Sequence, residues 1–468
     1  MNEQALEALL APYNPWWFKG DTWRGMLPDY DRPVVSEVLA DLRELPQMIS
    51  ITGPRRVGKS TAVKQIIGWL ISQGVQPSRI LYFSFDDPEI FASPRLQADI
   101  FDLLVDRMRR GGELAYLFLD EVQRLPRWEL FLKKYYDLKY RLRFVVSGSA
   151  SSPIFRSSQE SLLGRIKDRH LLPFSFREFC QYQFRHQQAF LEVIAAHRAL
   201  RPALLRYDAA GALKCVGELQ NALAPFAADL DQAVIAYAND GGFPEVWQLP
   251  DPVRKIEYLM EQQVRKVLYE DLMALTQYRK PENVLRFFVY LLSNPGVEIN
   301  VARIARDAEV ERRVVEENFP RLEMTDLIIR VQRFSNQPLR VRRGNVKTYP
   351  VDVALRNAVL KTWDWQGMPG GYLAENLVVR ELTSWAEKIE VSYYRDKDRE
   401  VDFVLTFGGT RHLPFEVKAG QDPAPPAGLR WFMDKYAIPL GVVITQGRDA
   451  RFEDRLLYIP LTFFLLAC

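Results

Sequence analysis

A glycine-rich segment near the start of the chain has the composition of a phosphate-binding loop. Residues 53–60 read GPRRVGKS, which fits the pattern G-x-x-x-x-G-K-[ST]. They follow the apolar segment MISITG and precede the helical pattern KSTAVKQIIGWLISQG, the context that this motif requires. Glycines let backbone N–H groups turn toward phosphate oxygens, and a helix N-terminus behind the loop favours anions. The segment therefore predicts a site for the phosphates of ATP.

Side chains of this loop and of a later acidic pair have distinct predicted roles. Lys59 would neutralise charge on the β- and γ-phosphates in catalysis, and Ser60 would ligate Mg²⁺. The segment LFLDE ends an apolar strand with Asp120 and Glu121. Adjacent acids at a strand end usually only begin a solvated loop, but a phosphate site needs a metal ligand and a base. We therefore predict that Asp120 holds the Mg²⁺ shell and that Glu121 polarises the attacking water.

Two further positions extend the predicted nucleotide site. Ser147 in FVVSGS could sense the γ-phosphate, and a turn-forming serine is the alternative. Arg165 in LLGRIKDR could act catalytically as an arginine finger on a neighbouring subunit's nucleotide, which requires a homo-oligomer. An exposed basic loop is the alternative. The predicted nucleotide-binding residues are Gly53, Pro54, Arg55, Arg56, Val57, Gly58, Lys59, Ser60, Thr61, Asp120 and Ser147.

A second set of acids lies near the C-terminus and suits metal-assisted chemistry. Asp402 lies in VDFVLTF, and Glu416 and Lys418 lie in FEVK, where positions two apart share one face of a strand. Asp402 and Glu416 could hold a divalent cation while Lys418 orients or activates water, as phosphodiester hydrolysis needs. Glu375, in a preceding helical segment, could complete the cluster. The alternative is a set of outward polar residues on a half-exposed sheet.

The loop between the two strands decides whether these acids meet. A two-residue Gly408-Gly409 turn would pair Phe407 with Thr410 and send Glu416 to the face opposite Asp402. A three-residue loop of Gly408, Gly409 and Thr410 would instead pair Phe407 with Arg411 and bring Asp402 opposite Glu416. We predict the three-residue loop, or a bulge near Pro414 with the same effect.

A basic segment is the candidate nucleic-acid surface. Residues 330–347 contain six basic residues and no acidic ones, where a winged helix would place its wing. We predict that Arg340, Arg342, Arg343 and Lys347 contact DNA phosphates, which supplies affinity without sequence choice. An exposed basic hairpin without a partner is the alternative.

The elements that must position these residues follow from the apolar pattern. Apolar strands alternate with helices from residue 48 to about 150, which predicts a parallel sheet covered on both faces. Residues 186–235 and 253–293 favour helices, with a turn at 240–245 between them. The last hundred residues favour a helix, alternating strands, a further helix and a strand. The final segment LTFFLLAC suits a buried strand and is too short to span a bilayer.

Composition excludes several classes of protein. A chain of 468 residues is too long for one core, and about three domains are expected. A net charge of +3 excludes a global polycation, so any nucleic-acid surface must be local. The 3 cysteines and 4 histidines are scattered, which argues against disulfides, structural zinc and a histidine-based triad. The N-terminus lacks the pattern of a secretory signal, and we expect a soluble cytoplasmic protein without a membrane partner.

With these residues laid out, the chain resembles AAA-type ATPases that carry a C-terminal restriction-endonuclease-like, or PD-(D/E)xK, domain of unknown function. The resemblance rests on GPRRVGKST, ILYFSFDDP, LFLDEVQ, VVSGSAS, LLGRIKDRHLLPFSFREF, GGFPEVW, YPVDVALRN, AENLVVREL, YYRDKDREVDFVL and FEVK. It implies an α/β fold with an N-terminal segment (1–33), a P-loop AAA-type core (34–185), a helical lid or connector (186–292), a winged-helix-like domain (293–350) and a nuclease-like α/β domain (351–468).

The resemblance also implies roles for individual residues. Asp402, Glu416 and Lys418 match the nuclease signature, with Glu375 at the helix position where such folds often place another acid. Ser147 departs from the Asn or Thr that AAA proteins frequently have there.

Three functions are consistent with these features. Our leading hypothesis is an Mg²⁺-dependent ATPase that assembles as a ring, such as a hexamer, or as another oligomer, and that remodels or translocates DNA, branched DNA included. The C-terminal domain would bind or cut that DNA. The second hypothesis is a nucleotide-driven switch whose nuclease-like domain only docks partners. The third is an active nuclease that ATP only licenses.

Overall fold

The computed structural model describes residues 3–149, 162–272, 280–336, 346–367, 370–385 and 389–468. The chain forms two compact units, an N-terminal unit of Met1–Leu172 and a C-terminal unit of Pro173–Cys468. Helix α8 (Phe176–Gln183) belongs to the C-terminal unit, so the compact units divide before the predicted domain boundary after residue 185, which stays a prediction.

The N-terminal unit is built on a parallel sheet, as the sequence predicts. In its described part, five strands lie in the order β2-β3-β4-β1-β5, and each adjacent pair is parallel. The strands are β1 (Met48–Gly53), β2 (Ile80–Ser84), β3 (Ala115–Asp120), β4 (Leu142–Ser149) and β5 (Ile166–His170). Strand β4 separates β1 from β3, so the loop after β1 and the end of β3 flank the end of β4.

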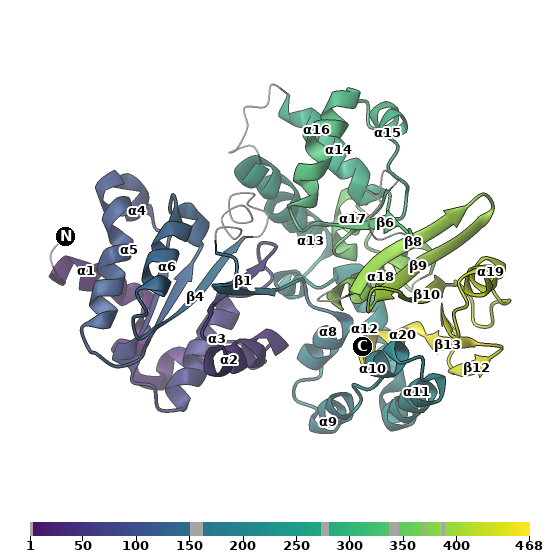
Figure 1. The fold of residues 1–468 in the computed structure, drawn as a ribbon, viewed down its shortest axis with the longest axis horizontal. Coiled ribbons are helices and arrows are strands. Elements are labelled where there is room, and N and C mark those ends of the chain that lie inside the picture. Colours follow the sequence, from purple (N-terminus) through teal and green to yellow (C-terminus); the bar gives the residue numbers. More distant parts are fainter. Residues whose placement is uncertain (1–2, 150–161, 273–279, 337–345, 368–369, 386–388) are drawn as a thin grey trace. The chain divides into compact units, whose positions relative to one another are not determined.

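Helices cover both faces of this sheet (Figure 1). Helices α2 (Pro33–Glu44) and α3 (Lys59–Ser72) contact β1, whereas α5 (Pro94–Arg109) and α6 (Trp128–Asp137) share a separate apolar core with β2, β3 and β4. The remaining helices in the described part of this unit are α1 (Glu3–Leu10), η1 (Ala11–Tyr13), η2 (Pro15–Trp17), η3 (Gly20–Met26), η4 (Pro77–Arg79), α4 (Pro88–Ala92) and η5 (Val122–Arg124).

The N-terminal segment is part of this unit. Leu6 and Leu10 of α1 lie in the same apolar core as α5 and α6. The buried Asn14 side chain donates to the carbonyl of Tyr82 at 2.9 Å and accepts from its N–H at 2.7 Å, as a neighbouring strand would. The segment therefore covers the edge of β2.

The C-terminal unit contains one mixed sheet. In its described part, eight strands lie in the order β12-β13-β11-β10-β9-β8-β6-β7. The strands are β6 (Ile328–Arg333), β7 (Val346–Pro350), β8 (Ile389–Asp396), β9 (Arg399–Phe407), β10 (Arg411–Val417), β11 (Gly441–Thr445), β12 (Arg451–Glu453) and β13 (Leu456–Pro460).

The predicted wing is not a separate structure. Strand β6 pairs with β7 as a hairpin, and its other edge pairs in parallel with β8, so both strands extend the sheet of the predicted nuclease-like domain. The helices α15 (Val301–Asp307) and α16 (Arg312–Glu323) of the predicted winged-helix-like domain at 293–350 are present, and its two strands join the larger sheet; the winged-helix assignment itself stays a prediction. The open edge of β8 supplies the hydrogen-bond partners that β6 needs.

Helices pack on both sides of the C-terminal sheet. Helix α19 (Ala427–Lys435) packs against Val404 and Val443, whereas Phe464 of helix α20 (Leu461–Ala467) contacts Phe415. The other helices are α9 (Gln188–Ala196), α10 (Leu200–Leu205), α11 (Ala209–Leu223), η6 (Ala224–Phe226), α12 (Ala227–Asp240), η7 (Pro244–Gln248), α13 (Pro252–Leu259), the π-helical η8 (Met260–Arg265) and η9 (Val267–Leu272), α14 (Pro281–Ser293), α17 (Val353–Leu360) and α18 (Tyr372–Ser384).

The last apolar segment is a helix, and the predicted strand there is wrong. Strand β13 ends at Pro460, and α20 begins at the next residue and contacts α8, α10, α11 and α12. A helix buried on all sides is apolar all round, so it lacks the period that distinguishes a helix from a strand.

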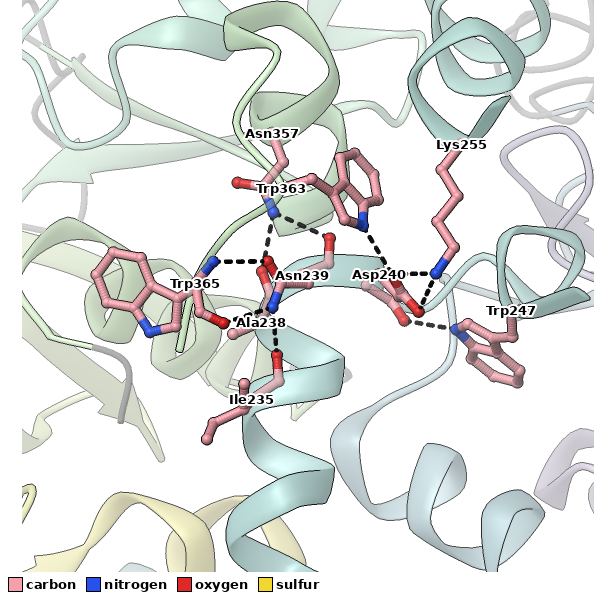
Figure 2. Close-up of polar contacts among 10 residues, drawn as sticks. Ile235, Ala238, Asn239, Asp240, Trp247, Lys255, Asn357, Trp363 and Trp365 are labelled. Atoms are coloured by element: carbon pink, nitrogen blue, oxygen red, sulfur yellow. Dashed lines mark hydrogen bonds and ion pairs between the residues drawn. The ribbon is translucent and has the colours of Figure 1, made fainter. Parts of the chain in front are cut away.

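Polar contacts fix the predicted turn at 240–245 after α12. Figure 2 shows Lys255 and Trp363 converging on the carboxylate of Asp240, at 2.7 Å and 2.8 Å. Gly242 donates its N–H to Asp352 at 2.6 Å, and a Cβ at Gly242 would lie 2.2 Å from the carbonyl oxygen of Phe174. These contacts connect the end of α12 to α13 and to the residues on either side of α17.

No helix in the described ranges is long and apolar enough to cross a membrane.

Candidate nucleotide and carboxylate sites

The loop after β1 has the tight backbone that its motif predicts. Gly53 has φ of 141°, and a Cβ there would lie 2.0 Å from the carbonyl oxygen of Leu171, so only glycine fits. Gly58 has φ of 96° and precedes Lys59, the first residue of α3. The segment from Pro54 to Val57 thus bridges the end of a strand and the N-terminus of a helix, where backbone N–H groups favour anions.

The ammonium of Lys59 lies inside this loop. Its side chain is buried, with 6% exposed, and Nζ donates to the carbonyl oxygens of Gly53 at 2.9 Å and Pro54 at 2.7 Å. These hydrogen bonds hold the ammonium of Lys59 inside the loop of residues 53–58, where the motif predicts that phosphates bind. Thr61 follows on the first turn of α3 and is half-buried.

Three hydroxyl groups converge on the carboxylate of Asp120. Ser60 donates to Oδ2 at 2.6 Å, Ser147 to Oδ1 at 2.5 Å and Tyr82 to Oδ2 at 2.8 Å. The structure thus brings together Ser60, Asp120 and Ser147, three of the predicted nucleotide-binding residues, whose roles stay predictions. A serine hydroxyl beside a carboxylate oxygen is a donor set that suits Mg²⁺, which prefers oxygen ligands.

Tyr82 is the residue that the sequence analysis missed. It lies in the middle of β2, and burial together with the charge of Asp120 raises its pKa far above the usual value. It therefore stays protonated and acts as a hydrogen-bond donor. The only sequence signal was a hydroxyl within the otherwise apolar run ILYF.

Glu121 occupies a strained position directly after the strand. Its φ of 50° lies in the left-handed region, which is uncommon for a side chain larger than glycine. Its carboxylate accepts a hydrogen bond from Gln123 at 2.5 Å, a second residue that the sequence analysis missed. Burial raises the pKa of Glu121, while the nearby charges of Lys59 and Arg55 oppose that rise. A raised pKa makes the carboxylate a better proton acceptor.

The predicted arginine finger is engaged within its own unit. Nε of Arg165 lies 3.0 Å from Oδ1 of Asp137, at the end of α6. The neighbouring Arg169 is paired with Asp41 at 2.6 Å. A role for Arg165 across a subunit interface stays a prediction.

In the C-terminal unit, the predicted strand register is observed. Phe407 pairs with Arg411 across the three-residue loop, and the pairing continues to Phe403 opposite Phe415. The next step along the two strands brings Asp402 to Glu416, and Oδ2 of Asp402 accepts from the N–H of Val417 at 2.8 Å.

Glu416 and Lys418 form a close pair beside Asp402. Nζ of Lys418 donates to Oε1 of Glu416 at 2.6 Å, and Glu416 is only 6% exposed. Its second oxygen, Oε2, is buried and has no hydrogen-bond partner in the described part of the chain. Burial raises the pKa of Asp402 well above the usual range, and the charges of Glu416 and Glu375 add to the rise. A divalent cation would satisfy the lone oxygen and relieve this repulsion, so the residues fit a metal site.

Glu375 does not complete a three-acid cluster. It accepts from the hydroxyl of Tyr349 at 3.3 Å and lines the same cavity as Asp402. Within the described residues, no group of three or more His, Cys, Asp or Glu side chains is close enough to hold a metal ion. Mg²⁺ usually takes one or two carboxylates and keeps water for the rest, so the Asp402–Glu416 pair is sufficient in number.

The predicted DNA-binding wing is corrected at Lys347. Arg340, Arg342 and Arg343 lie outside the described residues. Lys347 does not lie on the exposed surface that a wing would give it: it is 5% exposed, is paired with Glu400 and lies 5.1 Å from the ring centre of Tyr393. The reason is that β7 is a strand of the sheet, and its side chain at 347 faces the cavity that Asp402 lines.

Comparison with known proteins agrees with the N-terminal fold. Residues 45–180 match the family described as AAA domain, whereas residues 231–365 and 370–464 match two domains of unknown function, DUF8612 and DUF4143. An uncharacterized protein of Methanocaldococcus jannaschii is 24% identical over 90% of this chain and 85% of its own length. One of Haemophilus influenzae is 21% identical over 76% of this chain and 78% of its own.

Solved structures give weaker similarity. AMPPCP-bound DnaA from Aquifex aeolicus has a TM-score of 0.25 and 16% identity, over 62% of this chain and 87% of its own. PCH-2 of C. elegans has a TM-score of 0.26 and 17% identity, over 36% of this chain and 50% of its own. The family match and the phosphate loop define the N-terminal unit as an AAA-type ATPase-like domain.

Proposed function

We propose that this protein is an Mg²⁺-dependent ATPase that couples ATP hydrolysis to the binding and remodelling or translocation of DNA. The observation that carries the ATPase proposal is the contact between Ser60 and Asp120 at 2.6 Å, which joins the phosphate loop to the acidic strand end. Glu121 follows directly, with a pKa raised by burial, as a general base requires.

Each residue of this site has one task in the proposed reaction. Lys59 would contact the terminal phosphates, and Ser60 and Asp120 would hold Mg²⁺, which would supply positive charge to those phosphates. Ser147 and Tyr82 keep the carboxylate of Asp120 in place. Glu121 accepts a proton from the attacking water.

The C-terminal unit is the proposed DNA-binding and nuclease-like module. Asp402 and Glu416 would hold Mg²⁺, which acts there as a Lewis acid on a phosphodiester, and Lys418 would orient or activate water. Support comes from the unsatisfied Oε2 of Glu416 and from the resemblance to PD-(D/E)xK domains. Branched DNA is among the proposed substrates.

A homo-oligomer is part of this proposal. A ring would let Arg165 exchange Asp137 for the nucleotide of a neighbouring subunit, which adds positive charge where negative charge develops during hydrolysis.

The test compares ATP hydrolysis and DNA cleavage for the wild type, Lys59→Ala and Lys418→Ala with single-stranded, duplex and four-way-junction DNA. We expect DNA to stimulate the wild-type ATPase, Lys59→Ala to abolish hydrolysis, and Lys418→Ala to retain hydrolysis and lose any cleavage. A wild-type ATPase rate that no DNA form changes would refute the coupling. Unchanged hydrolysis in Lys59→Ala would place the nucleotide site elsewhere.

A second function, a nucleotide-driven switch, is favoured by one observation. The ion pair of Arg165 with Asp137 holds the arginine within its own unit, so hydrolysis in an assembly would stay slow until that pair opens and Arg165 reaches a neighbouring nucleotide. Slow turnover that DNA does not stimulate, together with tight retention of ADP, distinguishes the switch from the motor. Loss of DNA cleavage in Glu416→Ala with an intact ATPase would instead identify a nuclease that ATP licenses.

A further inference from the structure

A cavity of about 580 Å³ lies beside Asp402 in the C-terminal unit. Its volume is within the range of small-ligand sites. The walls come from β7, β8, β9, α18, α15 and the segment before α15, so residues of the predicted winged-helix region and of the nuclease-like sheet line one cavity. Its charged lining residues are Glu298, Arg303, Lys347, Glu375, Arg395, Glu400 and Asp402.

The carboxylate of Glu400 lies next to two of the basic side chains, Lys347 and Arg395. Oε1 of Glu400 is paired with Nζ of the buried Lys347, and Oε2 lies 3.9 Å from Nε of Arg395, the residue opposite Glu400 on β8. Arg395 also lies 3.8 Å from Glu298. Both contacts of Arg395 are long for an ion pair, so its guanidinium can take a closer anion.

The position of Glu400 relative to Asp402 matches the spacing of a polynucleotide. Glu400 and Asp402 are two positions apart on β9, so their Cα atoms are about 7 Å apart along the strand. That separation is close to the distance between successive phosphates of a DNA strand. An anion between Lys347 and Arg395 would therefore lie one nucleotide away from a phosphodiester at Asp402. The buried ammonium of Lys347 needs a negative partner in either state, because a lone buried charge is costly.

We propose that the cavity binds the DNA phosphate next to the phosphodiester at Asp402, with Lys347 and Arg395 as its cations and Glu400 as an internal anion that the DNA displaces. This inference rests on the proposed DNA-binding function of the C-terminal unit. Glu400 lowers the affinity for DNA and keeps Lys347 neutralised in the free protein.

The test measures binding of a fluorescein-labelled single-stranded DNA oligonucleotide to the full chain. The buffer contains Ca²⁺ and no nucleotide, and a gel confirms that the probe is intact. Glu400→Gln keeps the shape and removes the competing charge, and we expect it to bind the probe about fivefold more tightly. Arg395→Gln removes one phosphate contact, and we expect about fivefold weaker binding and a salt slope smaller by about 0.7. Glu453→Gln, an exposed position on β12, is the control for net charge.

The outcomes separate this inference from the function on which it rests. Affinity of Glu400→Gln within twofold of Glu453→Gln, in a wild type that binds DNA, would overturn the subsite alone. An unchanged salt slope in Arg395→Gln would also overturn it. A wild type that does not bind the probe would overturn both the subsite and the DNA-binding proposal, while the ATPase assay would still decide the nucleotide site. Thermal melting of each variant confirms that it is folded.

Discussion

The hydroxyl of Tyr82 donates a 2.8 Å hydrogen bond to Oδ2 of Asp120, so a residue of β2 helps to hold the predicted magnesium ligand on β3. Tyr82→Phe removes this donor and leaves the ring packing intact. One lost hydrogen bond of about 1 kcal/mol corresponds to about fivefold slower ATP hydrolysis. We expect this decrease in the ATPase rate of Tyr82→Phe at limiting Mg²⁺ concentration, and phosphate release measures it. Tyr116→Phe on β3 is the matched control and should keep the wild-type rate; equal losses in both variants would assign the effect to general destabilisation.

Glu121→Gln should separate nucleotide binding from hydrolysis. The amide cannot accept a proton from water, so we expect hydrolysis to fall by at least about 100-fold while ATP still binds. In the wild type, the raised pKa of Glu121 means that protonation inactivates the base at a higher pH than for an ordinary glutamate. The rate should therefore decline on the acid side before the protein unfolds. An ATPase rate in Glu121→Gln close to the wild type would exclude Glu121 as the base.

Asp402→Asn should remove metal binding from the C-terminal unit. Without nucleotide, we expect Mn²⁺ to raise the melting temperature of the wild type and to leave that of Asp402→Asn unchanged. Because burial and neighbouring acids raise the pKa values of Asp402 and Glu416, metal affinity should weaken as the pH falls, starting above the usual carboxylate range. Asp434→Asn on α19 is the control. A metal-induced shift that persists in Asp402→Asn would show that the site lies elsewhere.

Asp352 should make stability depend on pH. It accepts hydrogen bonds from Gly242 and Ala354, yet complete burial raises its pKa from 3.8 to about 6. A carboxyl whose pKa is raised on folding stabilises the protein fully below its unfolded-state pKa, and that contribution is lost as the pH rises through the folded-state pKa. The loss is at most about 3 kcal/mol.

The measurement is the difference in unfolding free energy between the wild type and Asp352→Asn from pH 4 to pH 7. We expect the wild type to lose stability relative to the variant as the pH rises. Parallel pH profiles would mean that Asp352 titrates normally.

Residue patterns within short segments predicted those parts of the two sites that lie in one segment or in two consecutive strands. The strand, loop and helix around Lys59 follow from residue spacing, and the three-residue loop at Gly408 is the one that brings Asp402 opposite Glu416. The contact of Ser147 with Asp120 depends on β4 lying beside β3, which the sequence analysis did not predict.

Contacts between distant segments could not be read from the sequence. Nothing local indicates that β6 pairs with β8, because the strand has the same pattern in a wing and in a larger sheet. That pairing moved Lys347 from a predicted exposed surface to the wall of a cavity. Tyr82 was missed for a related reason: one hydroxyl in a strand signals no partner until the strand order is known.

The pairing of β6 with β8 determines which fragments of the chain would keep the C-terminal sheet whole. A fragment beginning at residue 351 would lack β6 and β7, leave an edge of β8 unpaired and remove Lys347 from the cavity wall. The last quarter of the chain therefore lacks two strands of its own sheet. A fragment that keeps this sheet whole must begin before β6.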